Sequence, residues 1–202
     1  MKPLFLYDFD GTITTKDSLF DFLKFSTNSF KYYLGFCAFI PLFLGAKLKF
    51  FQKGGVKRRF ISFFLKGKSK DELTKTSQAY LQHIIKRPMF REAALNSIRK
   101  HKIEGDVYLV SASLDIWLTP IAKWLDIGLI CTKASYSNDI FNGKFSTPNC
   151  NYDEKVKRVV DEINIEDYQR KVYFGDSSGD LAMKDVVDEY HYRLFNIDTP
   201  LL

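Results

Sequence analysis

The chain has 202 residues, 46% of them hydrophobic and 27% charged, with a formal net charge of +6; this composition is typical of a globular protein with one domain and a sizeable insertion. Cys37, Cys131 and Cys150 are too few and too widely spaced for a disulfide framework or a zinc site, which indicates a reducing compartment. The first ten residues lack the order of a secretory signal, so we expect the chain to begin at Met1.

The positive charge is gathered in one stretch. No Asp or Glu occurs between Phe22 and Lys70, whereas the rest of the chain is net acidic. The basic residues of this stretch are Lys24, Lys31, Lys47, Lys49, Lys53, Lys57, Arg58, Arg59, Lys66, Lys68 and Lys70. A split of this size within a small protein indicates two parts with different surroundings.

The chain opens with a short apolar run at residues 4–9, which predicts a buried strand that ends at Asp8, Asp10 and Gly11. After an insertion at residues 17–85, strand and helix patterns alternate. We predict a helix at 88–102, a strand at 106–110, a helix at 114–125 and a strand at 129–132.

The second half continues in the same way. Asn142-Gly143 predicts the turn of a hairpin within residues 136–146. We then predict a helix at 153–163, a strand and a helix within 171–183, and a last strand at 190–195. The alternation favours an α/β fold, a Rossmann-like parallel sheet with helices on both faces.

Acidic side chains follow two of the predicted strands. Asp8 and Asp10 lie at the end of the first strand, and Asp176 and Asp180 at the end of a late one. In an open parallel sheet, ligands bind beyond the carboxyl ends of the strands, so we expect these carboxylates to converge. Such a cluster repels itself unless a cation neutralises it, and an all-oxygen site suits Mg²⁺.

The strand that ends at Ser111 brings a hydroxyl and the following backbone N–H groups, beginning with Ala112, to the same edge. Lys155, near the start of its helix, adds a positive charge, although neighbouring basic residues also fit a solvated helix face. Metal-binding oxygens, a hydroxyl and a lysine together describe a pocket for a phosphoryl group.

Four segments carry a resemblance to a known family. "DFDGT" from Asp8, "LVSAS" with Ser111, "EK" ending at Lys155 and "GDSSGD" from Gly175 resemble the four ordered motifs of the haloacid dehalogenase-like (HAD) superfamily. The insertion after the first motif and the "PNCNYDEK" approach to the lysine resemble its phosphoserine-phosphatase-like branch. The resemblance implies a catalytic core at residues 1–16 and 86–202 and a helical cap at 17–85.

The resemblance also implies roles for single residues. Asp8 would be the nucleophile that forms an aspartyl-phosphate, and Asp10 the general acid and base. Asp8, the backbone carbonyl of Asp10 and Asp176 would bind Mg²⁺, with Asp180 orienting that site from behind. Ser111, Ala112 and Lys155 would hold the phosphoryl oxygens.

Three residues of the insertion are candidate substrate contacts. Asp17 stands where this branch carries an acidic residue facing the substrate, but Asp17 or Ser18 also fits a helix N-cap. Arg58 and Arg59 lie in the basic stretch. In the last motif, Gly179 stands where phosphoserine enzymes usually carry Asn, which argues against phosphoserine itself.

The cap contains fifteen uncharged residues, 32–46, between two lysines. This segment is shorter than the roughly 20 apolar residues of a membrane span, and Pro41 is expected to kink or end a helix there. One interpretation is a helical hairpin buried against the core. The other is a segment on an anionic membrane, because Phe50, Phe51, Phe60, Phe63 and Phe64 are mixed with the basic residues. No nucleic-acid-binding module is visible, so we do not expect a nucleic acid partner.

Together these features predict a Mg²⁺-dependent phosphomonoesterase that acts on a phosphorylated small molecule or lipid. The cap region looks similar to that of phosphatidylglycerophosphatase C-type members, so a lipid phosphate is one substrate hypothesis; a soluble metabolite such as phosphoserine is another. A catalytically silent protein that binds a phosphorylated ligand is a third reading. We expect a cytoplasmic protein, peripheral on the inner face of the membrane under the lipid hypothesis.

Overall fold

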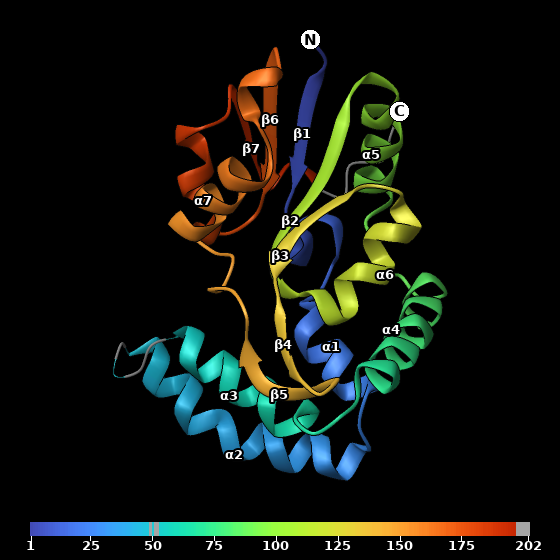
Figure 1. The fold of residues 1–202 in the computed structure, drawn as a ribbon, viewed down its shortest axis with the longest axis vertical. Helices are drawn as coiled ribbons and strands as arrows, with labels where there is room; N and C mark the ends of the chain where they lie inside the picture. Colours follow the sequence, from blue (N-terminus) through green and yellow to red (C-terminus); the bar gives the residue numbers. More distant parts are fainter. Residues whose placement is uncertain (49, 51–52, 197–202) are drawn as a thin grey trace.

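The computed structural model describes residues 1–48, 50 and 53–196. Its upper half in Figure 1 is a five-stranded, all-parallel sheet in the order β3-β2-β1-β6-β7. The strands are β1 (Pro3–Tyr7), β2 (Asp106–Leu114), β3 (Gly128–Thr132), β6 (Arg170–Gly175) and β7 (Glu189–Tyr192). β1 lies at the centre, between β2 and β6, so the chain leaves it where the strand order reverses.

The alternation of side chains along β1 separates two cores. Phe5 and Tyr7 pack on the face covered by α5 (Glu92–Glu104) and α6 (Asp115–Leu125). Leu4 and Leu6 pack on the other face, against α7 (Asp153–Glu162) and the short helix η3 (Ser178–Asp185). The predicted α/β fold, a parallel sheet with helices on both faces, is confirmed.

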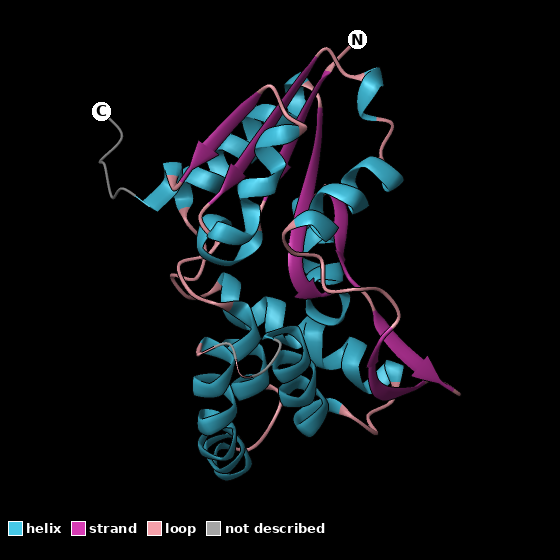
Figure 2. Ribbon diagram, turned by 90° about the vertical axis from the view of Figure 1, so that its left-hand side faces the viewer, coloured by secondary structure: helices cyan, strands magenta, loops and turns pink. Residues whose placement is uncertain are grey.

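The lower half of the molecule is a cap of four helices that follows β1 in the chain (Figures 1 and 2). These helices are α1 (Ser18–Phe25), α2 (Ser29–Lys47), α3 (Lys53–Leu65) and α4 (Lys70–Ile85). Asp17, Asn28 and Ser69 each begin a helix, since their side chains accept the N–H of Leu19, Lys31 and Glu72, respectively. Short helical turns at η1 (Phe9–Ile13), η2 (Ile165–Asp167) and η4 (Leu194–Asn196) complete the described chain.

A hairpin from the second half of the chain joins the cap. Its strands, β4 (Ala134–Ser137) and β5 (Ile140–Phe145), extend below the sheet, and β5 packs on α3. The prediction that Asn142-Gly143 forms the turn is wrong. The turn is Asn138-Asp139, where both residues have positive φ (49° and 61°), whereas Gly143 lies inside β5 with φ +81°. A Cβ at Gly143 would lie 2.3 Å from Ser62 Oγ, so glycine here allows the strand to approach α3 closely.

Several other boundaries differ from the predictions. α5 begins at Glu92 instead of residue 88, because Phe90 pairs with Thr14 in an antiparallel bridge before the helix starts. β2 continues to Leu114, with an irregular register after Ser111. β7 ends at Tyr192, because Arg193 turns the chain with φ 55° into η4.

The apolar segment at 32–46 lies within one helix, α2, which continues through Pro41 without the predicted end. α2 packs along α3: Gly35 approaches so closely that a Cβ there would lie 2.6 Å from Phe64 Cζ. It is not a hairpin buried against the core, because apolar side chains of the opposite face are exposed, namely Phe30, Tyr33, Leu34, Ile40 and Leu44. Among the described residues, α2 is also the one helix long and apolar enough to cross a membrane, by length and composition only.

Phe60 is the aromatic centre of the cap. It is fully buried on α3 and its ring lies 5.1–5.7 Å from the rings of Phe20, Phe39, Phe43 and Phe64. We expect Phe60→Ala to lower the free energy of unfolding by about 3–5 kcal/mol, because it leaves a cavity among these rings. Phe30→Ala, at a position 80% exposed on α2, should change it by no more than about 0.5 kcal/mol. Urea unfolding followed by circular dichroism measures both, and equal losses would contradict this packing.

Candidate active site

The first motif forms a tight turn directly after β1. The Asp8 N–H donates to the Phe174 carbonyl (2.9 Å), which holds Asp8 against the end of β6. The chain then turns through Phe9–Ile13, with Gly11 at φ +83°. A Cβ at Gly11 would lie 2.2 Å from Asp176 Oδ2, so this glycine is required both by its φ and by the carboxylate beside it. The turn therefore places Asp8 and Asp176 against one another.

The Lys155 ammonium lies at the centre of the acidic residues. It is 1% exposed and donates to Asp8 Oδ1 (2.8 Å), Asp180 Oδ1 (2.5 Å) and the Tyr173 hydroxyl (2.9 Å). Burial opposes its charge, but the Asp8 and Asp180 carboxylates outweigh that effect and raise the pKa of Lys155. Lys155 is thus a fixed cation in the site and not part of a solvated helix face.

Asp180 is held on both of its oxygens. Oδ1 accepts from Lys155 and from the Tyr173 hydroxyl (2.7 Å), and Oδ2 accepts from the N–H (3.0 Å) and hydroxyl (2.8 Å) of Ser177. Burial raises the pKa of a carboxyl at this depth, but Lys155 and these hydrogen bonds more than compensate, and the pKa of Asp180 lies below its usual value. Asp180 is therefore ionised, and its hydrogen bonds fix it next to the carboxylates of Asp8 and Asp176.

Asp10 has different partners from Asp8, although only one residue separates them. Its Oδ1 accepts the Ser18 N–H (2.6 Å), and its Oδ2 accepts the Ser113 hydroxyl (2.6 Å). Ser18 is itself held by the indole N–H of the buried Trp117, which donates to its hydroxyl (3.0 Å). Asp10 is thus anchored between the start of the cap and the end of β2, away from Lys155.

The carboxylates fit a divalent cation. Asp8, Asp176 and Asp180 each offer an oxygen, and these oxygens lie within 4.8 Å of one another. Asp176 Oδ1 is buried and, within the described residues, has no hydrogen-bond partner. Burial raises the pKa of Asp8 to about 8, against the opposing effect of Lys155, and burial together with Asp180 raises the pKa of Asp176. A cation held by Asp8 and Asp176 would give the Asp176 Oδ1 atom a partner, and its positive charge would lower the pKa of both carboxyls.

The predicted phosphate-binding residues, Ser111 and Ala112, lie in the last part of β2. Ser111 is buried, and its Oγ accepts the Ser113 N–H (3.1 Å). The Ala112 carbonyl accepts from the Thr132 hydroxyl (2.9 Å) and from the Lys57 ammonium of α3 (2.9 Å). These bonds hold this end of β2 in place and connect it to α3.

The cap residues are arranged differently from the sequence expectation. Arg58 and Arg59 are exposed on α3, whereas the preceding Lys57 reaches the core. Asp17 caps α1 through the Leu19 N–H (2.8 Å), which is the alternative role considered for it, and it also lines a cavity with Lys57.

Two residues of the site, Lys57 and Tyr173, were missed, and Ser113, the last residue of the "LVSAS" motif, was given no role. For Lys57 a signal existed, because the buried positions Val56, Phe60 and Phe64 recur at helical spacing and place residue 57 near the same face. For Ser113 and Tyr173, the alternation of side chains along a strand indicates that each side chain points into the protein. It does not indicate that Ser113 bonds Asp10 or that Tyr173 bonds Asp180.

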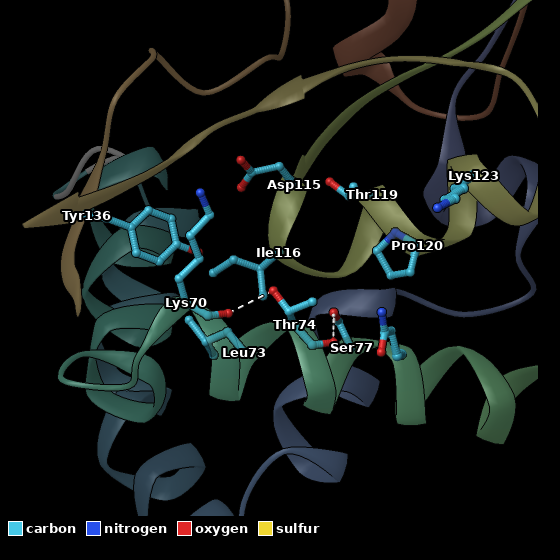
Figure 3. Close-up of a pocket in the computed structure, with 11 residues that line it drawn as sticks. Lys70, Leu73, Thr74, Ser77, Asp115, Ile116, Thr119, Pro120, Lys123 and Tyr136 are labelled. Carbon is cyan, nitrogen blue, oxygen red and sulfur yellow. Dashed lines mark hydrogen bonds between the residues drawn. The ribbon is translucent and has the colours of Figure 1, made fainter. Parts of the chain in front are cut away.

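A separate cavity of about 310 Å³ lies between α4 and α6 (Figure 3). Its walls are mainly apolar, with Leu73 contributed by α4 and Ile116 by α6, and with Lys70 and Tyr136 at one end. None of the predicted catalytic, metal or phosphate-binding residues lines it, so we assign it no part in the chemistry.

The chain is similar in sequence to proteins of one family. Residues 5–184 match the family model of the haloacid dehalogenase-like hydrolases. Protein CicA of Caulobacter vibrioides is 30% identical over 198 residues, which cover 96% of this chain and 87% of that protein.

Solved structures share the fold. A Bordetella pertussis Tohama I protein of unknown function superposes with a TM-score of 0.80 at 20% identity, covering 94% of this chain and 89% of that one. A substrate-bound phosphoserine phosphatase gives 0.66 at 17% identity, covering 95% and 86%. A phospho-aspartyl intermediate analogue of phosphoserine phosphatase gives 0.62 at 17% identity, covering 94% and 93%. The predicted resemblance to this superfamily and to its phosphoserine-phosphatase-like fold is confirmed.

The metal site leads to a prediction that does not need turnover. Mg²⁺ should raise the midpoint of thermal unfolding measurably in wild type, because it neutralises Asp8 and Asp176 only in the folded protein. In Asp176→Asn most of this increase should be lost, whereas Asp161→Asn, a matched change on α7 outside the cluster, should retain it. Differential scanning calorimetry with Mg²⁺ and with EDTA makes the comparison. An equal increase in all three proteins would contradict the assignment.

Proposed function

Because the chain belongs to the haloacid dehalogenase-like hydrolases, we propose that it is a divalent-metal-dependent phosphomonoesterase that works through an aspartyl-phosphate on Asp8. The observation that carries the proposal is that two neighbouring carboxylates have different hydrogen-bond partners. Asp8 accepts a hydrogen bond from Lys155, whereas Asp10 accepts hydrogen bonds from Ser18 and Ser113. One carboxylate is thereby placed for attack on phosphorus and the other for proton transfer.

The residues divide the reaction between them. Asp8 attacks phosphorus and forms the acyl phosphate, while Asp10 donates a proton to the leaving alkoxide oxygen. Asp10 then takes a proton from the water that attacks the acyl phosphate, which releases phosphate and restores Asp8. Lys155, the Ser111 hydroxyl and the N–H of Ala112 balance the charge on the phosphoryl oxygens. Bound Mg²⁺ would keep Asp8 ionised and add positive charge at the phosphoryl group.

Asp10 lends itself to this role because its position is fixed from both sides. The Ser18 N–H and the Ser113 hydroxyl leave its carboxyl little rotational freedom. Family members that use the fold to bind a phosphorylated ligand without turnover would not need an acid in this position. The anchored Asp10 therefore favours the enzyme over a catalytically silent binding protein.

For the substrate, we propose a membrane lipid phosphate, with phosphatidylglycerophosphate as the example to which the cap similarity points. The exposed apolar face of α2 supports this: Phe30, Leu34 and Leu44 are 80%, 57% and 56% exposed. No acidic residue occurs between residues 22 and 70, so the same region would be attracted to anionic lipid. α2 also packs on α3 through its inner face, which favours a helix lying on the membrane surface over one that crosses it.

A soluble phosphomonoester such as phosphoserine is the alternative substrate. Gly179 bears on it, because a Cβ at this position would lie 2.0 Å from Asn151 Oδ1. The Asn that phosphoserine enzymes usually carry would not fit there without movement of Asn151. This region of the site therefore differs from the phosphoserine pattern, which makes phosphoserine the less favoured substrate.

Asp8→Asn tests the reaction class. We expect the turnover of an aryl phosphate with Mg²⁺ to fall by about a thousandfold or more, because the amide cannot attack phosphorus. Asp126→Asn is the matched control, since Asp126 is an exposed residue in a left-handed turn that Asn also adopts. Circular dichroism checks that both variants are folded. Retention of most activity in folded Asp8→Asn would rule out this nucleophile.

Sedimentation with lipid vesicles tests the substrate class. The protein should bind vesicles that contain anionic lipid, bind neutral ones poorly, and dissociate as salt is raised. Leu34→Ser with Leu44→Ser should weaken binding, whereas Val160→Ser, at a position 45% exposed on α7, should not. If the protein ignores both kinds of vesicle and hydrolyses phosphoserine in preference to lipid phosphates, the lipid proposal is wrong.

A further inference from the structure

The hydroxyl of Tyr173 anchors the Lys155 ammonium on the side of β6. Tyr173 is fully buried and belongs to the core on the face of the sheet covered by α7. Its ring is stacked on that of Tyr190 from the neighbouring strand β7, with the ring centres 5.7 Å apart and the planes inclined by 8°. Packing that does not involve the acidic residues therefore fixes the position of this hydroxyl.

The chemistry of the partners shows where the hydrogen atoms lie. An ammonium only donates and an ionised carboxylate only accepts. Lys155 therefore donates to the Tyr173 oxygen (2.9 Å), and the Tyr173 hydroxyl donates to Asp180 Oδ1 (2.7 Å). The ring of a phenylalanine would fill the same space as the tyrosine ring and make neither of these bonds.

The three N–H groups of the Lys155 ammonium match the three acceptors that the described residues provide. These acceptors are Asp8 Oδ1 (2.8 Å), Asp180 Oδ1 (2.5 Å) and the Tyr173 hydroxyl. Under the proposed function, Asp8 is the member of this set that forms a bond to phosphorus. Asp180 and Tyr173 thus occupy two N–H groups, and one is left for Asp8 and for a phosphoryl oxygen beside it.

Loss of the Tyr173 hydroxyl would leave one N–H of Lys155 without its acceptor, on a side chain that is 1% exposed. Buried polar groups rarely stay unpaired, so the ammonium would turn toward another acceptor. Asp180 Oδ2 already accepts from the N–H and hydroxyl of Ser177, which leaves the Asp8 carboxylate. A second hydrogen bond on Asp8 would hold the oxygen lone pairs that attack phosphorus, and attack would become slower.

We propose, on the basis of the phosphatase function above, that Tyr173 is a positioning residue whose hydroxyl limits Lys155 to one hydrogen bond with the nucleophile, Asp8. Tyr173 acts through Lys155 and does not itself touch the substrate. Its hydroxyl therefore affects the rate of attack on phosphorus and not the binding of the phosphoryl group.

Tyr173→Phe tests this role, and Tyr190→Phe is the matched control. The control removes a hydroxyl from the stacked ring, and that hydroxyl has no hydrogen-bond partner within the described residues. With an aryl phosphate and Mg²⁺, we expect kcat of Tyr173→Phe to fall by about tenfold to a hundredfold, the factor for loss of a hydrogen bond to a charged group. KM and the inhibition constant of inorganic phosphate should stay within about twofold of wild type. Tyr190→Phe should leave all three values unchanged.

Exchange of the Lys155 ammonium protons with water tests the anchor without turnover. NMR of isotope-labelled protein should show slow exchange in wild type and in Tyr190→Phe, because all three N–H groups are hydrogen-bonded, and faster exchange in Tyr173→Phe. Lys155→Arg identifies the signal, which is missing from its spectrum. If Tyr173→Phe does not fold, the wild-type protein decides: exchange as fast as at the exposed Lys100 would contradict the three bonds.

The outcomes separate this inference from the proposed function. If wild type is active and Tyr173→Phe has the same kcat, or loses phosphate binding together with kcat, the positioning role is overturned and the phosphatase stands. Unchanged ammonium exchange in Tyr173→Phe also overturns it. If wild type hydrolyses no phosphomonoester although exchange becomes faster in Tyr173→Phe, the anchor on Lys155 is right and the phosphatase function is wrong.

Discussion

The buried ammonium of Lys155 is the interaction on which the site depends. Asp8 and Asp180 lie against it with 7% and 0% of their surface exposed, a depth at which unpaired carboxylates would protonate. Removal of one partner from such a buried group of charges costs about 3–5 kcal/mol, so the three residues hold β1, α7 and the loop after β6 in one arrangement. The proposed nucleophile, Asp8, is thus held in place by the fold itself.

Two features of the backbone position Lys155 between Asp8 and Asp180. Tyr152, just before α7, has φ 53° and ψ −134°, which is rare for a residue with a side chain, and its N–H donates to the Gly179 carbonyl (2.9 Å). Gly179 in turn leaves room for Asn151. The segment before α7 and the loop after β6 are therefore packed against one another. A change in either segment is expected to move the Lys155 ammonium.

Much of this core could be predicted from the sequence, whereas the arrangement of the cap helices and of the hairpin that joins them could not. Apolar runs that end in Asp8, Ser111 and Asp176 indicate strands. Because parallel strands bring their carboxyl ends to one edge of the sheet, the sequence also indicates that these three side chains lie near one another. The turn of the β4–β5 hairpin and the course of α2 through Pro41 depend on contacts with α3, which local patterns do not contain. Lys57 was missed because helical spacing indicates only which side of α3 it lies on, whereas its partner, Ala112, is far away in the chain.

The central claim is that Asp8 carries the phosphoryl group during turnover. Rapid acid quenching of the enzyme with Mg²⁺ and an aryl phosphate, followed by mass spectrometry of the peptide that contains residues 6–18, tests it most directly. If Asp8 is the nucleophile, we expect one added phosphoryl group on Asp8, present at early times and lost as substrate is exhausted. A phosphoryl group on Ser111, or on no residue while the substrate is being consumed, would contradict it.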